Sequence, residues 1–287
     1  MMKMDFSDIG KPFQPGISRE EVELLAEDGR PRVVHFSSYH RNALKRSPGA
    51  NWVGAFNVPF KETISPIVSE DTGLALWKNK NFEGYWCSIK TEEQYDEIRL
   101  WIKRQGSRVF IRDRLALSLA LDYNFSPDER RTTLGELERR AKYEEDADAR
   151  DEICDAMSSA LSELPFYREA NLIAAVPPRS GKRYDLPSYL ASSVAERTSL
   201  VNLTPHFQWY GEKETLKELQ IDEKWVGLER ADLVLNSSLE GESIILIDDL
   251  YQSGTTMQYT AMKCLERGAK RIYGLAVVKA RSNTDNV

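Results

Sequence analysis

The sequence has little of several features that mark specialised classes of protein. Its three cysteines, Cys87, Cys154 and Cys264, are far apart and form no CxxC pair, so neither a zinc ribbon nor a disulfide framework is indicated and we expect reduced thiols. No apolar run approaches the roughly 20 residues of a membrane span. The N-terminus also has no apolar core of the kind found in signal peptides. We therefore expect a soluble cytoplasmic protein with no membrane partner.

An excess of basic charge is absent as well. The 287 residues carry a formal net charge of -6, so no overall positive field concentrates nucleic acid around the molecule, although a local basic patch stays open. With 41% hydrophobic and 29% charged residues, the composition is that of an ordinary globular protein. The length suffices for one large domain or two modest ones.

Changes of pattern divide the chain into three parts. Residues 1–30 are polar, contain several glycines and prolines, and predict a lead-in segment with one short amphipathic helix. Residues 31–126 combine short strands with a threonine-capped helix over 91–105, which indicates a small α+β domain of unknown role. The polar segment 126–131 is the predicted boundary, and residues 127–287 form the second domain.

In the second domain, helices and strands alternate. We predict one long polar helix over 134–164 and then a strand, a helix, two strands, a helix and a strand over 171–178, 186–197, 229–236, 243–250, 255–267 and 271–278. Such alternation is typical of a doubly wound parallel sheet that is covered by helices on both faces. The predicted fold class is therefore α/β, with a smaller N-terminal α+β domain.

The segment 244–257 has the chemistry of a phosphate-and-ribose site. An apolar strand ends in Asp248 and Asp249, a like-charged pair that needs hydroxyl donors or a cation. Gly254 permits a tight turn, and the amides that open the next helix attract an anion. The alternative is a plain strand end followed by a helix cap. The combination at this spacing favours the binding site.

These residues resemble the signature of type I phosphoribosyltransferases. The resemblance implies that Asp248 and Asp249 are the catalytic acidic pair and hold the ribose hydroxyls. It also implies Mg2+ as cofactor, held mainly by the substrate, with the same two carboxylates as its candidate protein ligands. Phosphoribosyl pyrophosphate itself would be bound by the residues that follow: Leu250, Tyr251, Gln252, Ser253, Gly254, Thr255 and Thr256.

Within that superfamily, residues 131–281 look most like the ComF-like group. The segment IAAVPPRSGKRYDLP resembles the first strand and the pyrophosphate loop of that group, and assigns to the loop Pro178, Arg179, Ser180 and Lys182. The segment 208–233 resembles the hood over the active site, with Lys213, Lys224 and Arg230 as pyrophosphate contacts or, equally, solvated charges. The chain departs from the group in lacking a zinc ribbon and in its Arg183–Pro187 segment.

The N-terminal part leaves alternatives open. Its aromatic residues, Trp52, Phe56, Phe82, Tyr85, Trp86 and Trp101, fit core packing better than base stacking. His35 and His40 offer metal or phosphate ligands, but His35 fits a structural role in a strand. A basic cluster, Lys103, Arg104, Arg108, Arg112 and Arg114, fits a solvated surface better than a nucleic-acid surface.

Three functions follow. The first is an enzyme, a pentosyltransferase that joins ribose 5-phosphate to a nitrogenous acceptor. The second is a non-catalytic regulator that binds phosphoribosyl pyrophosphate or a nucleotide and acts on a partner or nucleic acid through residues 32–125. The third is an effector that modifies nucleotides. A homodimer stays open for all three.

Overall fold

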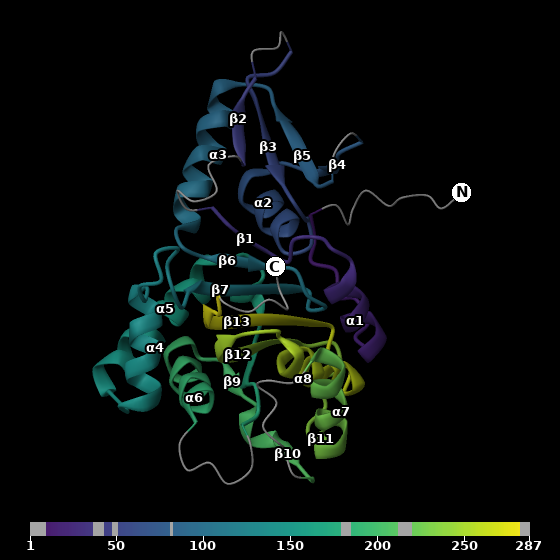
Figure 1. The fold of residues 1–287 in the computed structure, drawn as a ribbon, viewed down its shortest axis with the longest axis vertical. Coiled ribbons are helices and arrows are strands. Elements are labelled where there is room, and N and C mark those ends of the chain that lie inside the picture. Colours follow the sequence, from purple (N-terminus) through teal and green to yellow (C-terminus); the bar gives the residue numbers. More distant parts are fainter. Residues whose placement is uncertain are drawn as a thin grey trace.

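The larger of two main sheets in the molecule is mostly parallel (Figure 1). A computed structural model of the chain describes residues 10–36, 43–47, 51–80, 83–178, 185–211 and 220–281. The large sheet has seven strands in the order β1-β6-β7-β13-β12-β8-β9. From β7 to β9 every neighbouring pair is parallel, whereas β1, β6 and β7 pair antiparallel at the other edge. The expected α/β fold with a mostly parallel sheet is confirmed.

The strands of this sheet come from both halves of the sequence. They are β1 (Val33–His35), β6 (Val109–Ile111), β7 (Leu117–Tyr123), β8 (Leu172–Ala175), β9 (Val201–Asn202), β12 (Ser243–Tyr251) and β13 (Arg271–Lys279). The large sheet therefore crosses the boundary that we expected at residue 126, because β7 from the expected domain 31–126 pairs in parallel with β13 from the expected domain 127–287. The described residues between β1 and β6 form a second, antiparallel sheet.

Helices cover both faces of the large sheet. One face carries α4 (Thr133–Tyr143), α5 (Ala147–Glu163) and α6 (Leu186–Thr198), and the other carries α1 (Arg19–Glu27), α7 (Ile221–Ala231) and α8 (Thr255–Glu266). Alternate residues of β12 serve the two layers, as the period of a strand requires. Ile245 and Ile247 join the core with α4, α5 and α6, while Ile244 and Leu246 join the core with α7 and α8. Short 3-10 helices, η3 (Tyr167–Glu169) and η4 (Thr204–His206), complete this part.

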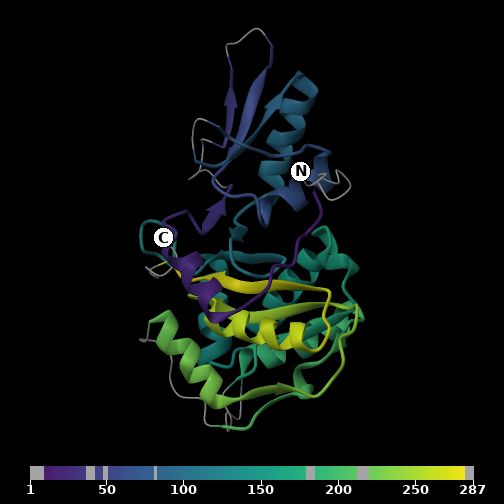
Figure 2. The same cartoon turned by 90° about the vertical axis from the view of Figure 1, so that its right-hand side faces the viewer.

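The N-terminal unit stands beyond the β1 edge of the large sheet (Figures 1 and 2). Its four-stranded antiparallel sheet has the order β2-β3-β5-β4, formed by β2 (Leu44–Arg46), β3 (Gly54–Val58), β4 (Trp77–Lys78) and β5 (Tyr85–Ile89). The helix α3 (Glu92–Gln105) packs against β5, and α2 (Ile64–Thr72) packs against α3. These elements together form a smaller α+β unit.

Aromatic residues join this unit to the large sheet. Trp101 of α3 is fully buried and contacts Phe36, Phe56 and Phe110, with ring centroids 5.1 to 6.0 Å apart. Phe56 and Trp101 therefore serve the core, as we preferred for the aromatic residues. Tyr85 and Trp86 are half-buried, Trp52 is 41% exposed, and Phe82 lies outside the described residues.

The basic cluster proposed for residues 103–114 is not a single solvated surface. Arg112 is 1% exposed, and its guanidinium donates to both carboxylate oxygens of Asp28 at 2.7 Å. Arg114 donates to the carbonyl oxygen of Gly16 at 2.8 Å. These two arginines therefore tie the lead-in segment to the sheet, because a buried guanidinium needs acceptors for its fixed donors. The segment also packs through α1 against α7.

Two further predictions for the second half are corrected. The long helix over 134–164 is two helices: Glu145 takes a left-handed φ of 53°, and the Asp146 side chain caps α5 by accepting from the Ala149 amide. The strand expected over 229–236 does not enter the parallel sheet. It is β11 (Leu233–Leu235), which pairs antiparallel with β10 (Phe207–Trp209) in a separate small sheet.

Two further findings concern the cysteines and the helices of the described residues. Cys87, Cys154 and Cys264 are buried and free. Within the described ranges, no helix has the length and apolar character that crossing a membrane requires.

Candidate functional site

The acidic pair lies where β12 approaches its carboxyl end. Ile247 is paired with Ala175 of β8, and Asp248 with Ala276 of β13, so both neighbouring strands end at the same edge. Asp248 is half-buried and Asp249 is 7% exposed. The Asp249 amide donates to Oδ1 of Asp248 at 2.9 Å, which fixes one carboxylate against the strand. In open parallel sheets, this edge is where ligands bind.

The turn that follows leads straight into α8. Gly254, at the N-cap, has a left-handed φ of 74° and offers no side chain to cap the helix. The hydroxyl oxygens of Ser253 and Thr255 lie 2.9 Å apart, and both residues are buried. A helix start without a side-chain cap presents its amides to an anion, and the helix dipole adds positive potential. Two hydroxyls thus flank a site suited to phosphate.

The ring of Tyr251 packs against the turn at Gly254. A Cβ atom on Gly254 would lie 2.0 Å from the Tyr251 hydroxyl, so only glycine fits over this ring. The hydroxyl donates to Oδ2 of Asp113 at 2.9 Å, and Oδ1 of Asp113 accepts from the Leu115 amide at 3.0 Å. Burial raises the pKa of Asp113 above its ordinary value, although these donors oppose the shift. Asp113 was not predicted as a site residue, because it lies far from the turn along the chain.

A lysine from α4 completes the site and was also missed. Nζ of Lys142 lies 2.7 Å from Oδ2 of Asp249 and 3.3 Å from Oε1 of Glu138, one turn earlier on the same helix. Glu138 is 5% exposed. A glutamate and a lysine four residues apart commonly pair on a helix surface, and nothing local in the sequence indicates that this pair faces β12. The pairing places a positive charge between two buried carboxylates.

The position of α4 depends on close contacts at its start. Thr132 caps the helix and its hydroxyl donates to the carbonyl oxygen of Tyr123 at 2.5 Å. A Cβ atom on Gly135 would lie 2.1 Å from the carbonyl oxygen of Asn124, so glycine lets α4 approach the end of β7. These contacts hold the helix so that Lys142 reaches the acidic pair.

Burial and charge oppose each other in this cluster. Burial lowers the pKa of Lys142, but the carboxylates of Asp249 and Glu138 outweigh it and hold the pKa above the ordinary value. Burial raises the pKa of Glu138 above its ordinary value, although Lys142 acts in the opposite direction. Lys142 is therefore a permanent cation at neutral pH.

The expected pyrophosphate loop begins beside the acidic pair. The Val176 amide donates to the carbonyl oxygen of Ile247 at 2.8 Å, so the residues that follow β8 start next to β12. Pro178 is half-buried at this point. The other residues assigned to the loop, Arg179, Ser180 and Lys182, lie outside the described residues. Beyond the gap, Asp185 caps α6 by accepting from the Ser188 amide at 3.1 Å.

The expected hood residues are separated. Lys213 lies outside the described residues, whereas Lys224 and Arg230 lie on α7. Lys224 is 6% exposed, so it is not a solvated charge, while Arg230 is exposed. The helix packs on α8 through Trp225, whose ring meets that of Tyr259 edge-on at 5.3 Å. Lys224 and Arg230 thus lie on a helix that packs against α8, which begins at Thr255.

The remaining residues of the expected phosphate-binding segment lie at the end of β12, in the turn and in the first turn of α8. Leu250, Gln252 and Thr256 are half-buried.

His35 is buried and its ring meets Tyr123 edge-on at 5.1 Å, in agreement with a structural role, and His40 lies outside the described residues. In the described ranges, no group of three or more His, Cys, Asp or Glu side chains has the arrangement of a metal site. Asp248 and Asp249 supply oxygen donors of the type that Mg2+ takes when substrate and water provide the rest.

Comparisons with known proteins give structural similarity only. No family model matches the sequence, and no curated protein matches it. The chain is similar to a purine phosphoribosyltransferase from Pyrococcus horikoshii, with 12% identity and a TM-score of 0.31 over 45% of this chain and 82% of that one. A hypoxanthine phosphoribosyltransferase from Staphylococcus aureus gives 13% identity and a TM-score of 0.32 over 47% and 66%. A phosphoribosylpyrophosphate synthetase from Mycobacterium smegmatis gives 10% identity and a TM-score of 0.29 over 74% and 77%.

Proposed function

We propose that the protein is a Mg2+-dependent phosphoribosyltransferase, which binds phosphoribosyl pyrophosphate and transfers ribose 5-phosphate to a nitrogenous acceptor. One observation carries the proposal. The strand β12 carries Asp248 and Asp249 and is followed by a turn in which the hydroxyls of Ser253 and Thr255 flank the start of α8. Carboxylates suit ribose hydroxyls, and a helix start suits the 5-phosphate. The two halves of the ligand thus find complementary groups within one short segment.

The chemistry asks little of the protein beyond binding and orientation. The acceptor nitrogen forms a bond to the anomeric carbon while the bond from that carbon to the pyrophosphate oxygen breaks. The electron pair leaves with pyrophosphate, and the acceptor gives up a proton to water. Asp248 and Asp249 hold the sugar, and the amides of α8 hold the phosphate, so the anomeric carbon is fixed in one orientation. No protein nucleophile is required.

The bound metal would neutralise charge on the departing pyrophosphate. Asp248 and Asp249 are the side chains that would hold it, together with oxygens of the substrate. Lys142 already offsets part of their negative charge at a distance of 2.7 Å from Asp249. This reduces the repulsion that the two carboxylates would otherwise exert on an incoming polyanion.

The test is release of pyrophosphate. The full chain is incubated with phosphoribosyl pyrophosphate, Mg2+ and a panel of purine bases, pyrimidine bases and amines. We expect release that depends on one class of acceptor, is abolished by chelation of Mg2+ and is lost in Asp249→Asn. Asp96→Asn is the matched control, since Asp96 is an exposed carboxylate on α3. If no acceptor leads to release of pyrophosphate, the proposal that the protein is a transferase is contradicted.

A second function is favoured by the same lysine. Because Lys142 pairs with Asp249, a cation of the protein itself satisfies part of the acidic pair. A non-catalytic regulator that binds phosphoribosyl pyrophosphate or a nucleotide needs no more than this. Measurable binding without release of pyrophosphate would select the regulator over the transferase.

A further inference from the structure

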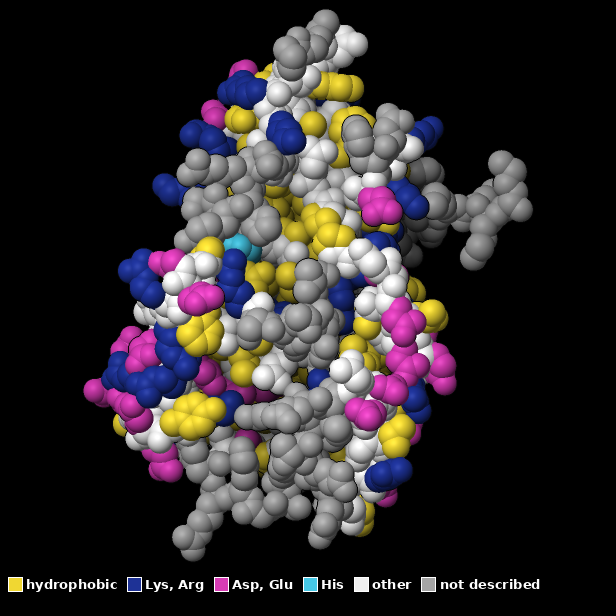
Figure 3. Space-filling view, in the orientation of Figure 1, with side chains coloured by type: hydrophobic (Ala, Val, Ile, Leu, Met, Phe, Trp, Pro, Cys, Tyr) yellow, Lys and Arg dark blue, Asp and Glu magenta, His cyan; other side chains and the backbone are white. Residues whose placement is uncertain are grey.

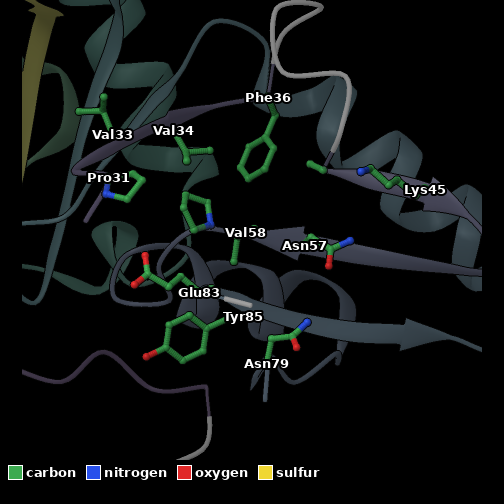
Figure 4. A pocket seen from close by; sticks show the side chains of 13 residues that line it. Pro31, Val33, Val34, Phe36, Lys45, Asn57, Val58, Asn79, Glu83 and Tyr85 are labelled. Carbon is green, nitrogen blue, oxygen red and sulfur yellow. The ribbon is translucent and has the colours of Figure 1, made fainter. Parts of the chain in front are cut away.

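A second cavity lies far from the acidic pair, between β1 and the N-terminal sheet (Figure 4). Its volume is about 720 Å³, within the range of about 300 to 1,000 Å³ typical of small-molecule sites. Figure 3 shows hydrophobic side chains gathered on this face between the N-terminal unit and the large sheet. The strands β6, β7 and β13 separate β1 from β12, so this cavity is distinct from the candidate site above.

Most of the cavity wall is apolar. It is formed by Pro31, Val33, Val34 and Phe36 around β1, and by Val58 and Pro59 at the end of β3. Phe36 and Tyr85 lie on opposite sides of the cavity in the view of Figure 4. Two aromatic rings and several branched side chains make a lining that suits a flat, weakly polar group.

Polar groups line the cavity on two sides. In Figure 4, Lys45, Asn57 and Asn79 lie toward the right, and Glu83 lies at the left, away from Lys45. Asn57 is half-buried, and its side-chain amide makes no hydrogen bond to any residue that the structure describes. Over the same described ranges, Lys45 forms no ion pair. The Asn57 amide thus offers a donor and an acceptor to a ligand in the cavity.

The chemistry of these groups defines the ligand. An asparagine amide offers one donor face and one acceptor, the combination that pairs with the edge of a nucleobase. Lys45 supplies a point charge for an anion at the rim. We propose that this cavity binds a free mononucleotide, with the base between the apolar walls, its edge on Asn57 and its phosphate near Lys45.

Binding is tested on the full chain by equilibrium dialysis with AMP, IMP, UMP and ribose 5-phosphate as probes. We expect at least one nucleotide to bind more tightly than ribose 5-phosphate. Lys45→Ala and Asn57→Leu should each weaken that binding by about fivefold to tenfold, the loss of one hydrogen bond or one charge contact. Lys78→Ala, which removes an exposed lysine from β4 outside the cavity, should leave the affinity within about twofold.

Three outcomes overturn the proposal. The first is equal affinity for ribose 5-phosphate and the nucleotides, because the base is then not bound. The second is unchanged affinity in Lys45→Ala, an exposed position at which the variant is expected to fold even if Asn57→Leu does not. The third is binding of an oligonucleotide but of no mononucleotide, which indicates a nucleic-acid surface. Asp249→Asn separates the two sites: loss of nucleotide binding there assigns the nucleotide to β12 and contradicts this cavity.

Discussion

Nζ of Lys142 lies 2.7 Å from Oδ2 of Asp249, so an ion pair joins α4 to the carboxyl end of β12. The contact is largely buried, because the Asp249 side chain is 10% exposed and the Lys142 side chain 23% exposed. Glu138 approaches the same ammonium group at 3.3 Å. The lysine therefore holds two carboxylates that would otherwise repel each other inside the protein.

Removal of this cation should destabilise the protein. We expect Lys142→Met to lower the free energy of unfolding at pH 8 by about 3 kcal/mol, the lower end of the range for a broken buried pair. Burial raises the pKa of Glu138 and Lys142 opposes this, so without Lys142 the pKa of Glu138 should rise further. Since protonation then relieves the repulsion, the loss should shrink as the pH falls from 8 to 5. Urea unfolding at the two pH values measures this.

The control for this variant is a surface lysine. Lys263 pairs with Glu266 at 3.1 Å on α8, but the Glu266 side chain is 52% exposed. We expect Lys263→Met to cost less than about 1 kcal/mol, with little dependence on pH. Equal costs for the two variants would mean that Lys142 has no special role.

The turn before α8 should not tolerate a side chain at Gly254. Gly254→Ala combines a left-handed φ of 74° with a Cβ atom 2.0 Å from the Tyr251 hydroxyl. Gly241→Ala is the matched control, since Gly241 has a φ of 76° with nothing within 4 Å of the added Cβ. The control should cost about 1 kcal/mol from backbone strain alone. Thermal unfolding should show a clearly larger loss for Gly254→Ala, and similar losses would refute the contact with Tyr251.

The lead-in segment should be held by a pH-dependent contact. Arg112 donates to Asp28 and holds the pKa of this carboxyl below its ordinary value. A depressed pKa contributes stability above the unfolded pKa of about 3.9 and loses it as the pH falls through the folded value. Asp28→Asn should therefore cost about 2 kcal/mol at pH 7 and much less at pH 3. Urea unfolding that gives the same cost at both pH values would contradict the pairing.

The parts of the candidate site that the sequence predicts are local. Asp248, Asp249 and the Ser253–Thr256 turn lie within one strand, one turn and one helix start, so spacing alone relates them. Lys142 and Asp113 were not predicted because they reach the site through tertiary packing. Neither has a distinctive neighbour in sequence, and only the position of α4 and of the β6–β7 connection brings them to β12.

The fold shows the same limit. The alternation of helices and strands predicted the parallel part of the sheet, because β12 and β13 have strong apolar patterns. The pattern did not reveal that β1, β6 and β7 extend this sheet, since pairing partners of short buried strands leave no mark in their sequence. It likewise did not separate β11 from the parallel strands.

Calorimetric titration with phosphoribosyl pyrophosphate in the presence of Mg2+ is the most direct test of the β12–α8 site. The native chain and Asp96→Asn should bind with equal affinity. Asp249→Asn and Thr255→Ala should each bind at least about tenfold more weakly, because each loses a polar contact to the ribose or the phosphate. Native-like binding by both variants, with their fold intact by circular dichroism, would show that phosphoribosyl pyrophosphate does not occupy this site.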